Sequence, residues 1–394
     1  MSRRNFIQLA GGGIILAATS AVTGCSSTLP REATAPWRTA GSDEADVRRW
    51  MLGWALLAPK AHTLQSWVVD LRTANEITLY CDRDRLLPQT DPYSRQILLS
   101  HGTFLEVLDM AARERGLRAR IELFPEGTFA PTTVDGRPVA RVRLQPDPTV
   151  NRDPLFAQVV HRRTNRETYD PRVPAASALQ VIQSAVGAGS DPATVAGALT
   201  VGFATADQTD RIAEHRRIAR EAWRIEMTTP ATIMESLKVL RIGPDEINRH
   251  RDGIAINTPM VRALVAVGLF DRSKAPAPGD SSIQRQIDDF NDKIDATPAF
   301  FWLVSRGNDR ATQVNAGRAY VRAQLAATEA GLGMHPLSQA LQEYPQVAQP
   351  YAQIHALLGA RPGLQTVQMW TRLGHAPAID PSPRRGIAAL VRQA

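Results

Sequence analysis

Helix-like and strand-like segments are mixed in both halves of this 394-residue chain, and this mixture most restricts the folds open to it. Apolar residues at three- and four-residue spacing predict helices at 47–57, 92–116, 155–160 and 312–330. Short apolar runs predict strands near 67–71, 77–81, 120–124, 139–144, 201–204, 300–305 and 367–373. Because these elements do not alternate strictly as βαβ units, the sequence predicts an α+β fold and not a doubly wound sheet.

The boundaries of several elements carry their own signals. Ser42 is the expected N-cap of the first helix, and Pro59 is expected to stop it. Residues 381–385 are expected to open a short C-terminal helix. Residues 207–297 are polar and helical, but prolines at 230, 244, 259, 276 and 278 predict several separate pieces. This stretch has no counterpart in the first half of the chain.

The first 25 residues have the pattern of an export signal. Arg3 and Arg4 precede an apolar run over 9–22 that is too short to span a bilayer, and Val-Thr-Gly leads into Cys25. The paired arginines are typical of the twin-arginine route, and the last four residues resemble a lipoprotein cleavage site. We therefore expect residues 1–24 to be removed and Cys25 to be lipidated. The alternative is a membrane helix that begins with basic residues.

This signal predicts where the protein works. It implies passage through the twin-arginine translocase and a lipid-anchored position on the periplasmic side of the cell envelope. Since this route exports proteins that are already folded, it also favours a cofactor inserted before export. Residues 25–42, rich in small and polar residues, are expected to be a flexible tether. The mature chain is then expected to have halves at 43–150 and 151–394.

Charge and cysteine usage exclude several classes of function. The net charge of +7 falls to +5 when Arg3 and Arg4 leave with the signal (7 − 2), and no run of five basic residues occurs. This pattern favours an anion site and not a nucleic-acid surface. Cys81 has no partner for an internal disulfide once Cys25 is lipidated, and its strand-like surroundings predict burial. The eight histidines lack metal-ligand spacing, so no metal site is expected.

Four segments carry candidate binding chemistry: 58–67, 162–166, 331–338 and 384–385. Arginines and a hydroxyl suit a phosphate dianion, because guanidinium groups donate paired, charge-assisted hydrogen bonds. A glycine pair at a helix end lets the backbone approach a flat ring closely. Each segment also has a structural interpretation: a solvated turn for 162–166, a helix cap for 331–333, and a tail for the basic pair.

The order of these segments resembles that of the nitroreductase-like flavoproteins, in particular the Acg-like FMN-binding branch, in which two nitroreductase-like halves are fused in one chain. The similarity extends over nearly the whole mature chain and includes 82–88, 90–92, Gly102 with Glu106, and 372–374. It implies a nitroreductase-like α+β fold in which the two halves form a pseudo-dimer. It also implies a monomer with one FMN site.

The resemblance assigns roles residue by residue. Arg162, Thr164, Arg384 and Arg385 would hold the phosphate, and Arg166 would reach the ribityl chain or the pyrimidine edge. Arg163 belongs to the same set of cofactor-binding donors. The remaining residues would lie along the two sides of the ring: Gly331, Gly333, Pro336 and Leu337 on one, and Pro59, Lys60, Ala61 and Thr63 on the other. No catalytic side chain is implied, and His62 and His335 are expected to be structural hydrogen-bonding groups.

The loop at 60–67 departs from the family pattern. Lys-Ala-His-Thr-Leu-Gln-Ser-Trp replaces Ser-Ser-His-Asn-Thr-Gln-Pro-Trp, which removes two hydroxyls, an amide and a proline. Three lost hydrogen bonds at ~1 kcal/mol each would weaken flavin binding by about a hundredfold. Lys60 adds a cation that offsets part of this loss.

The resemblance implies three alternatives for function. The first is an FMN oxidoreductase that passes two electrons to a flat acceptor such as a nitroaromatic or a quinone. Nicotinamide cofactors are cytoplasmic, so a membrane quinol or a redox protein is the expected donor. The second is an exported lipoprotein that sequesters FMN beneath a lid, for which residues 207–297 are the candidate. The third is a flavin-free relative with a degenerate site.

Overall fold

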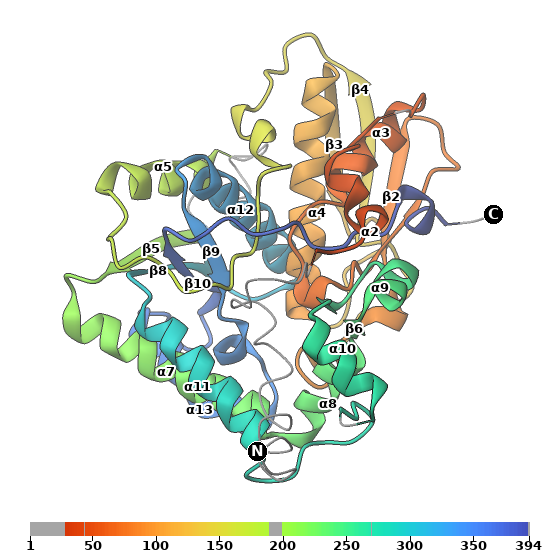
Figure 1. Ribbon diagram of the computed structural model, residues 1–394. Helices are drawn as coiled ribbons and strands as arrows, with labels where there is room; N and C mark the ends of the chain where they lie inside the picture. The colour runs from red at the N-terminus through yellow and green to blue at the C-terminus, as the bar shows by residue number, and fades with distance from the viewer. Residues whose placement is uncertain (1–27, 43, 189–198, 269, 393–394) are drawn as a thin grey trace.

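The computed structural model describes residues 28–42, 44–188, 199–268 and 270–392. Its first half is a four-stranded antiparallel sheet with strand order β1-β2-β4-β3. The long helix α4 lies between the second and third strands in the chain (Figure 1). The elements are α3 (Val47–Ala55), β1 (Trp67–Asp70), β2 (Glu76–Cys81), α4 (Arg95–Glu114), β3 (Leu117–Leu123) and β4 (Ala140–Pro146).

The second half repeats this connectivity. Its sheet is also antiparallel, with order β5-β8-β10-β9, so its first, second, third and fourth strands are arranged 1-2-4-3 as in the first sheet. The long helix α12 again lies between the second and third strands. The elements are α5 (Ala176–Gly187), β5 (Leu199–Thr205), β8 (Ala299–Arg306), α12 (Arg310–Glu329), β9 (Gly333–Pro336) and β10 (Gln365–Gly374). The α+β prediction is confirmed.

The insertion predicted at 207–297 occupies one defined place in this repeat. It connects β5 to β8, whereas the equivalent strands β1 and β2 are joined directly by the short turn at 71–75. Several separate elements form it, as the prolines predicted: α7 (Thr209–Thr228), α8 (Pro230–Lys238), β6 (Leu240–Ile242), α9 (Pro244–His250), β7 (Ile254–Ile256), α10 (Pro259–Ala266) and α11 (Ser281–Asp295).

The insertion has two parts with different positions. Helices α7 and α11 lie beside α13 (Ala348–Leu357) beneath the second sheet, whereas α8, β6, α9 and α10 extend toward the first half (Figure 1). Strand β8 shows why the second sheet needs this cover. Phe301 and Leu303 face the core shared with α12, whereas Phe300 and Trp302 face the core that includes α7 and α11. Helices α7 and α11 therefore cover the second sheet, whereas the second part lies toward the first half.

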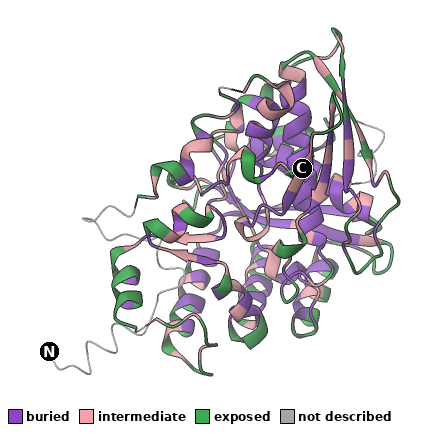
Figure 2. Cartoon of the chain, turned by 90° about the vertical axis from the view of Figure 1, so that its right-hand side faces the viewer, coloured by how far each residue is buried: buried purple, intermediate pink, exposed green. Residues whose placement is uncertain are grey.

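The pattern of buried residues also differs between the two sheets (Figure 2). In β8 every residue except the last is buried, because helices cover both faces of the sheet. In β3 the residues alternate between half-buried and exposed, because only one face of the first sheet is covered. The long apolar run in β8 and the alternating pattern in β3 are thus consequences of where the insertion packs.

Helices α4 and α12 cross at the centre of the molecule. Glycines at the crossing, Gly102 and Gly317, leave no room for a Cβ atom. The crossing also holds a buried ionic group: Glu106 accepts hydrogen bonds from Arg318 Nε at 2.8 Å and from Arg322 Nη1 at 2.9 Å. Arg322 Nη1 also donates to Asp153 Oδ2 at 2.7 Å. A buried carboxylate flanked by two guanidiniums keeps its charge, and the pKa of Glu106 is lowered although burial opposes this.

Several local expectations are corrected. The N-cap of α3 is Asp46, whose carboxylate accepts from the backbone N–H of Arg48 at 2.8 Å, and not Ser42. The helix expected at 155–160 is the 3₁₀ turn Pro154–Gln158, and the C-terminal helix is a 3₁₀ turn at Ile387–Ala389. Both α5 and α13 escaped prediction, because only a few residues of each helix are buried and neither presents a long apolar face to the core.

The tether expectation is wrong for the described part of 25–42. Residues Arg31–Thr34 form α2 and Ala35–Trp37 form a 3₁₀ turn, and Ala33 and Trp37 are buried. Burial of a tryptophan removes enough apolar surface from water to hold a short segment in place. Cys25 and the signal at 1–24 lie outside the described residues.

Candidate functional site

The predicted basic segments meet at one backbone carbonyl. Arg162 Nη2 and Arg384 Nη2 donate to the oxygen of Leu57 at 3.0 and 3.1 Å. Leu57 follows α3 in the first half, whereas Arg162 lies at the start of the second half and Arg384 near the C-terminus. Both arginines are almost fully buried, and Arg162 also donates to Gln324 Oε1 of α12 at 3.2 Å. The structure therefore brings segments 162–166 and 384–385 together beside the residue that precedes segment 58–67.

The indole ring of Trp37 lies against the guanidinium groups of this basic cluster. The guanidinium carbons of Arg163 and Arg384 each lie 4.5 Å from the centre of the indole ring, and that of Arg162 lies at 5.5 Å. The indole N–H donates to the carbonyl of Ser382 at 2.8 Å. An aromatic face stabilises cations without neutralising them, so it leaves their charge available to an anion. Sequence analysis missed Trp37, although a tryptophan within a supposed flexible tether was a signal of docking.

Lys60 points its ammonium group into the same cluster. Its Nζ is buried, lies 5.4 Å from the centre of the Trp67 ring, and has no hydrogen-bond partner among the described residues. Burial, followed by repulsion from Arg384 and Arg162, holds the pKa of Lys60 well below its ordinary value. Repulsion from Arg385 acts in the same direction. Repulsion among neighbouring cations is unfavourable in the protein without ligand, and a bound anion would offset it.

The loop that carries Lys60 has a strained backbone. His62, Thr63 and Gln65 have φ angles of 43°, 58° and 55°, a region that side chains other than glycine seldom adopt. Neighbouring groups fix this conformation: the N–H of Ala61 donates to Ser100 Oγ at 3.1 Å, and Thr103 Oγ1 donates to the Pro59 carbonyl at 2.6 Å. Strain of this kind persists only where surrounding contacts over-determine it, and it is typical of binding loops.

Gln65 ties this loop to two other segments. Its side-chain amide donates to the Arg251 carbonyl of the insertion at 2.9 Å and accepts from the Arg385 backbone N–H at 2.8 Å. The Arg385 guanidinium donates in turn to the Gln65 carbonyl. A second link to the insertion runs from the Gly253 N–H to the Thr63 carbonyl at 3.2 Å. Gln65 is fully buried, so these bonds are shielded from water.

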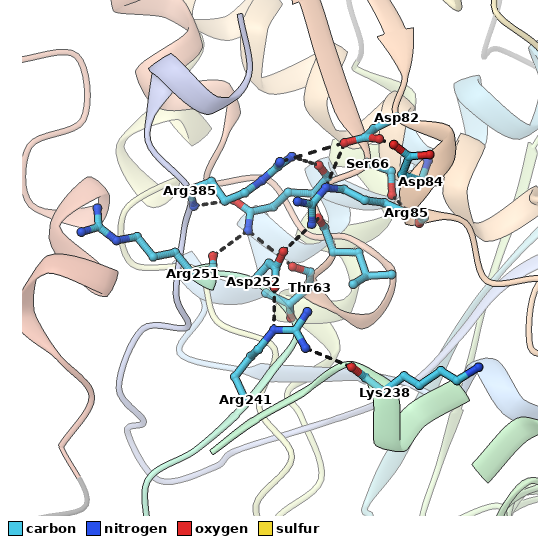
Figure 3. Close-up of polar contacts among 12 residues, drawn as sticks. Thr63, Ser66, Asp82, Asp84, Arg85, Lys238, Arg241, Arg251, Asp252 and Arg385 are labelled. Carbon is cyan, nitrogen blue, oxygen red and sulfur yellow. Dashed lines mark hydrogen bonds and ion pairs between the residues drawn. The ribbon is translucent and has the colours of Figure 1, made fainter. Parts of the chain in front are cut away.

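Asp252 anchors the insertion beside the loop (Figure 3). Its carboxylate is buried, pairs with Arg85 from the first half, and accepts from Arg241 Nε of β6 at 2.9 Å. Arg85 also pairs with Asp82 at 2.9 Å. Asp252 favours the charged forms of both Lys60 and Arg385, so it lies near the basic cluster. No sequence motif pointed to this residue, because its partners are 11 and 167 positions away.

Arg166 and two histidines lie at the other end of the candidate site. Arg166 is deep enough for burial to lower the pKa of its guanidinium, yet its side chain is accessible to solvent. Burial, and then repulsion from Arg166, lowers the pKa of His62 to about 4. The same two causes hold the pKa of His335 well below its ordinary value, so both imidazoles are neutral at pH 7.

The Arg162–Arg166 segment runs alongside β9. The N–H of Asn165 donates to the Met334 carbonyl at 3.0 Å, and Thr164 forms a parallel bridge with Met334. Gly333 packs closely here, because a Cβ atom at this position would lie 3.3 Å from the Asn165 Cβ. Pro336, at the end of β9, is half-buried. This arrangement places Gly333 and Pro336 on the same strand as His335.

Two predicted site residues have other positions. Gly331, with φ +70°, caps α12 and is exposed, and nothing lies near its missing side chain. This is the helix-cap interpretation given above. The Leu337 side chain is 1% exposed and packs in the core beneath the second sheet, so it does not border the candidate site. Its backbone N–H donates to the Trp370 carbonyl at 2.8 Å, which explains why the side chain turns inward.

Tyr320 and Gln324 of α12 are site residues that sequence analysis missed. Tyr320 is buried, and its hydroxyl has no hydrogen-bond partner within the described chain. Arg162 and Arg166 both favour its ionised form, so the hydroxyl lies between the two ends of the site. These residues come from the middle of a regular helix, where an apolar-periodicity pattern does not distinguish a ligand-facing polar group from a structural one.

The described ranges also bear on metal binding, membrane crossing and thiol chemistry. They contain no group of three or more histidine, cysteine or acidic side chains that could hold a metal ion. None of the described helices has the length and apolar character required to cross a bilayer. Cys81 is free and buried, and burial raises the pKa of its thiol to about 12. The expectation of a buried, unpaired Cys81 is thus confirmed.

Comparisons with known proteins point in one direction. No protein-family model matches the sequence. Two proteins of Mycobacterium tuberculosis, from strains CDC 1551 / Oshkosh and ATCC 25618 / H37Rv, are each 25% identical over 356 residues. The alignments cover 88% of this chain and 92% of each relative, and both relatives are named provisionally as NAD(P)H nitroreductases.

Solved structures match part of the chain. The FMN-dependent nitroreductase NfnB from Mycobacterium smegmatis, solved with NADPH, has a TM-score of 0.37 and 14% identity, covering 60% of this chain and 96% of its own. A nitroreductase-like protein from Bacillus cereus has a TM-score of 0.35 and 13% identity, covering 62% and 97%. Along most of its length, the chain is thus similar in sequence to proteins named as nitroreductases.

Proposed function

We propose that this protein binds FMN and is an exported, lipid-anchored oxidoreductase. The observation that carries the proposal is the buried basic cluster of Lys60, Arg162 and Arg384, in which donors lack partners within the described chain. Besides Lys60 Nζ, these unpartnered atoms are Arg163 Nε, Arg384 Nε and Arg385 Nε. Buried donors that are not satisfied by protein are costly, so four such donors on neighbouring cations suit an anionic ligand.

The residues present fit the parts of FMN. A phosphate dianion matches the cluster in charge, and arginine matches it in geometry. Tyr320 Oη and His62 Nδ1 are also buried without partners in the described residues, and they suit the polar ribityl chain and the edge of the ring. A flat ring would lie beside β9, where Gly333 packs against Asn165, Ala376 and Tyr169. The first-half loop would face it from the opposite side.

The protein's own groups position the cofactor and control its surroundings. FMN would supply two-electron redox chemistry, for which no side-chain nucleophile is needed. Lys60 and the arginines would hold the phosphate, and Arg166 would place a fixed positive charge near the pyrimidine edge. Neutral His62 and His335 would donate or accept hydrogen bonds without adding charge. The proposed acceptor is a flat nitroaromatic or quinone, and the proposed donor is a membrane quinol or a redox protein.

The contacts of the insertion favour a second candidate, an FMN-sequestering lipoprotein without general turnover. The insertion is held against the loop by two hydrogen bonds, from the Gly253 N–H to the Thr63 carbonyl and from the Gln65 amide to the Arg251 carbonyl. The Asp252 ion pairs add to this attachment. A covered flavin would exchange slowly with solvent and would admit a second flat molecule poorly. A flavin-free relative remains the third alternative, since the loop has lost the hydroxyls and the amide found in the family pattern.

One spectrum and one assay separate these candidates. The protein purified from a twin-arginine-competent host should absorb in the near ultraviolet and blue and release about one FMN per chain. Arg162→Ala combined with Arg384→Ala should abolish binding, since each charged hydrogen bond contributes ~1.5–3 kcal/mol. A colourless protein that binds no added FMN by calorimetry would leave the flavin-free alternative. Turnover with NADPH or a quinol then distinguishes an oxidoreductase from a sequestering protein.

Export is tested separately. Arg3→Lys with Arg4→Lys should retain the precursor in the cytoplasm, and Cys25→Ala should release a soluble periplasmic form. A Cys25→Ala protein that still fractionates with membranes would contradict the lipid anchor.

A further inference from the structure

The most exposed large apolar side chains of the described residues lie on α10. Met260 is 65% exposed and Val267, directly after the helix, is 67% exposed. They are seven positions apart and therefore lie on the same side of the helix, with the exposed Ala263 between them. Val261 and Leu264 point into the protein and hold α10 in place. Met260, Ala263 and Val267 thus form an apolar stripe that no other described segment covers.

The described chain begins close to this stripe. The Thr28 carbonyl accepts from Asn257 Nδ2 at 2.8 Å, and Asn257 lies three residues before Met260. Helix α2 then packs against α9, next to α10 (Figure 1). Only three peptide steps separate Cys25 from Thr28, a reach of at most roughly 11 Å. A lipid on Cys25 would therefore hold this face of the protein near the bilayer surface.

We propose that α10 is a membrane-contact helix whose apolar stripe enters the headgroup region of the bilayer that holds Cys25. The inference rests on the proposed lipid anchor. Exposed apolar side chains on an amphipathic helix partition into the interface, and the exposed Arg262 of α10 suits anionic headgroups. The lipid attaches the protein at a single point, so a second contact fixes its orientation on the membrane. Residues 251–253, which cover the candidate site, then lie beside the lipid phase, where an apolar electron donor such as a quinol is concentrated.

The test uses the lipidated full-length protein in vesicles of phosphatidylcholine and phosphatidylglycerol. A polarity-sensitive fluorophore is attached to Met260→Cys or, as matched control, to Val181→Cys on α5, which is 48% exposed and far from α10 in Figure 1. Cys81 will not react, because its thiol is buried and its pKa is raised. The probe at 260 should shift to the blue, and brominated lipid should quench it at least about fivefold more than the probe at 181.

The outcomes separate this inference from the proposed anchor. A protein that does not associate with vesicles at all overturns the anchor and the inference together. Stable association with equal quenching at 260 and 181 overturns the inference alone. A probe at 260 that shifts to the blue without quenching by lipid assigns the stripe to contact with another copy of this chain, which also overturns the inference. Circular dichroism of both labelled variants confirms that they are folded.

Discussion

Gly102 and Gly317 occupy reciprocal positions where α4 crosses α12. A Cβ atom on Gly102 would lie 1.8 Å from the Val314 carbonyl oxygen, and one on Gly317 would lie 1.9 Å from that of Leu99. Each glycine therefore faces the residue three positions before the other glycine. A pseudo-twofold axis that relates two equivalent halves would produce both this reciprocity and the strand order that the two sheets share. It supports the expected pseudo-dimer within one chain.

Alanine at either glycine should destabilise the protein severely. Gly102→Ala or Gly317→Ala must push the two helix backbones apart at the centre of the core, and we expect a loss of ~3 kcal/mol or more in the free energy of unfolding. Urea denaturation followed by circular dichroism measures it. Gly187→Ala is the control, because nothing lies within 4 Å of a Cβ there and the helix should gain slightly. Equal effects at positions 187 and 317 would show that the close crossing is not limiting.

Lys60 should make FMN affinity depend on pH. A bound dianion raises the lowered pKa of Lys60, so binding takes up a proton when the pH lies between the two values. Affinity should therefore fall as pH rises in the wild type. Lys60→Met should weaken binding by roughly 10- to 100-fold at low pH and remove most of the slope. Calorimetric titrations across pH measure both. Lys238→Met, at an exposed lysine of α8, should change neither, and an unaltered slope in Lys60→Met would place the phosphate elsewhere.

Asp252→Asn should weaken the attachment of the insertion to the first half while the core of the protein stays packed. The substitution removes the charge that pairs with Arg85 and Arg241, and it also makes the basic cluster more attractive to an anion. We therefore expect both association and dissociation of FMN to become about tenfold faster, with a smaller change in affinity. Stopped-flow recovery of free-flavin fluorescence follows both rates. Asp245→Asn, at an exposed acid in the same insertion, is the control, and unchanged rates in Asp252→Asn would make the insertion a surface appendage.

Glu226 should make stability depend on pH near neutrality. This buried carboxyl of α7 accepts from Gln342 Nε2 at 2.8 Å, and burial raises its pKa from 4.5 to about 7. Because the folded pKa is higher than the unfolded one, its stabilising contribution is complete below pH 4.5 and is lost as pH rises through 7. The contribution is at most about 3 kcal/mol.

Glu226→Gln isolates this effect. The variant should match the wild type near pH 5 and be more stable by ~1–3 kcal/mol near pH 8, since no buried charge forms. Urea midpoints at the two pH values measure the difference. The buried histidines titrate in the opposite sense, but they are common to both proteins and cancel. Glu221→Gln, at a partly exposed glutamate of α7 whose pKa is lowered by Arg224, should not gain stability at pH 8. The same gain at both pH values in Glu226→Gln would mean that Glu226 does not ionise in this range.

The sequence determined the elements whose residue pattern reflects local physics. The helices at α3, α4 and α12 and all seven strands expected there carry apolar residues at the spacing of their own geometry, and each prediction lies within a few residues of the observed element. The basic segments were also recognisable, because guanidinium groups cluster in sequence where they bind a common group. Their meeting at the Leu57 carbonyl agrees with the order of segments that suggested it.

Only the tertiary structure decided what packs against these elements. Trp37 and Asp252 gain their roles from partners that are distant in the chain, and no local pattern encodes such pairs. Leu337 resembled a ring-facing residue, but the core beneath β10 offered its side chain a larger apolar burial. The insertion was visible as a polar helical stretch, yet its division into a sheet-covering part and a site-covering part depends on which surfaces the two sheets leave open. Local periodicity records how a segment folds, whereas the free energy of burial, summed over distant contacts, decides where it docks.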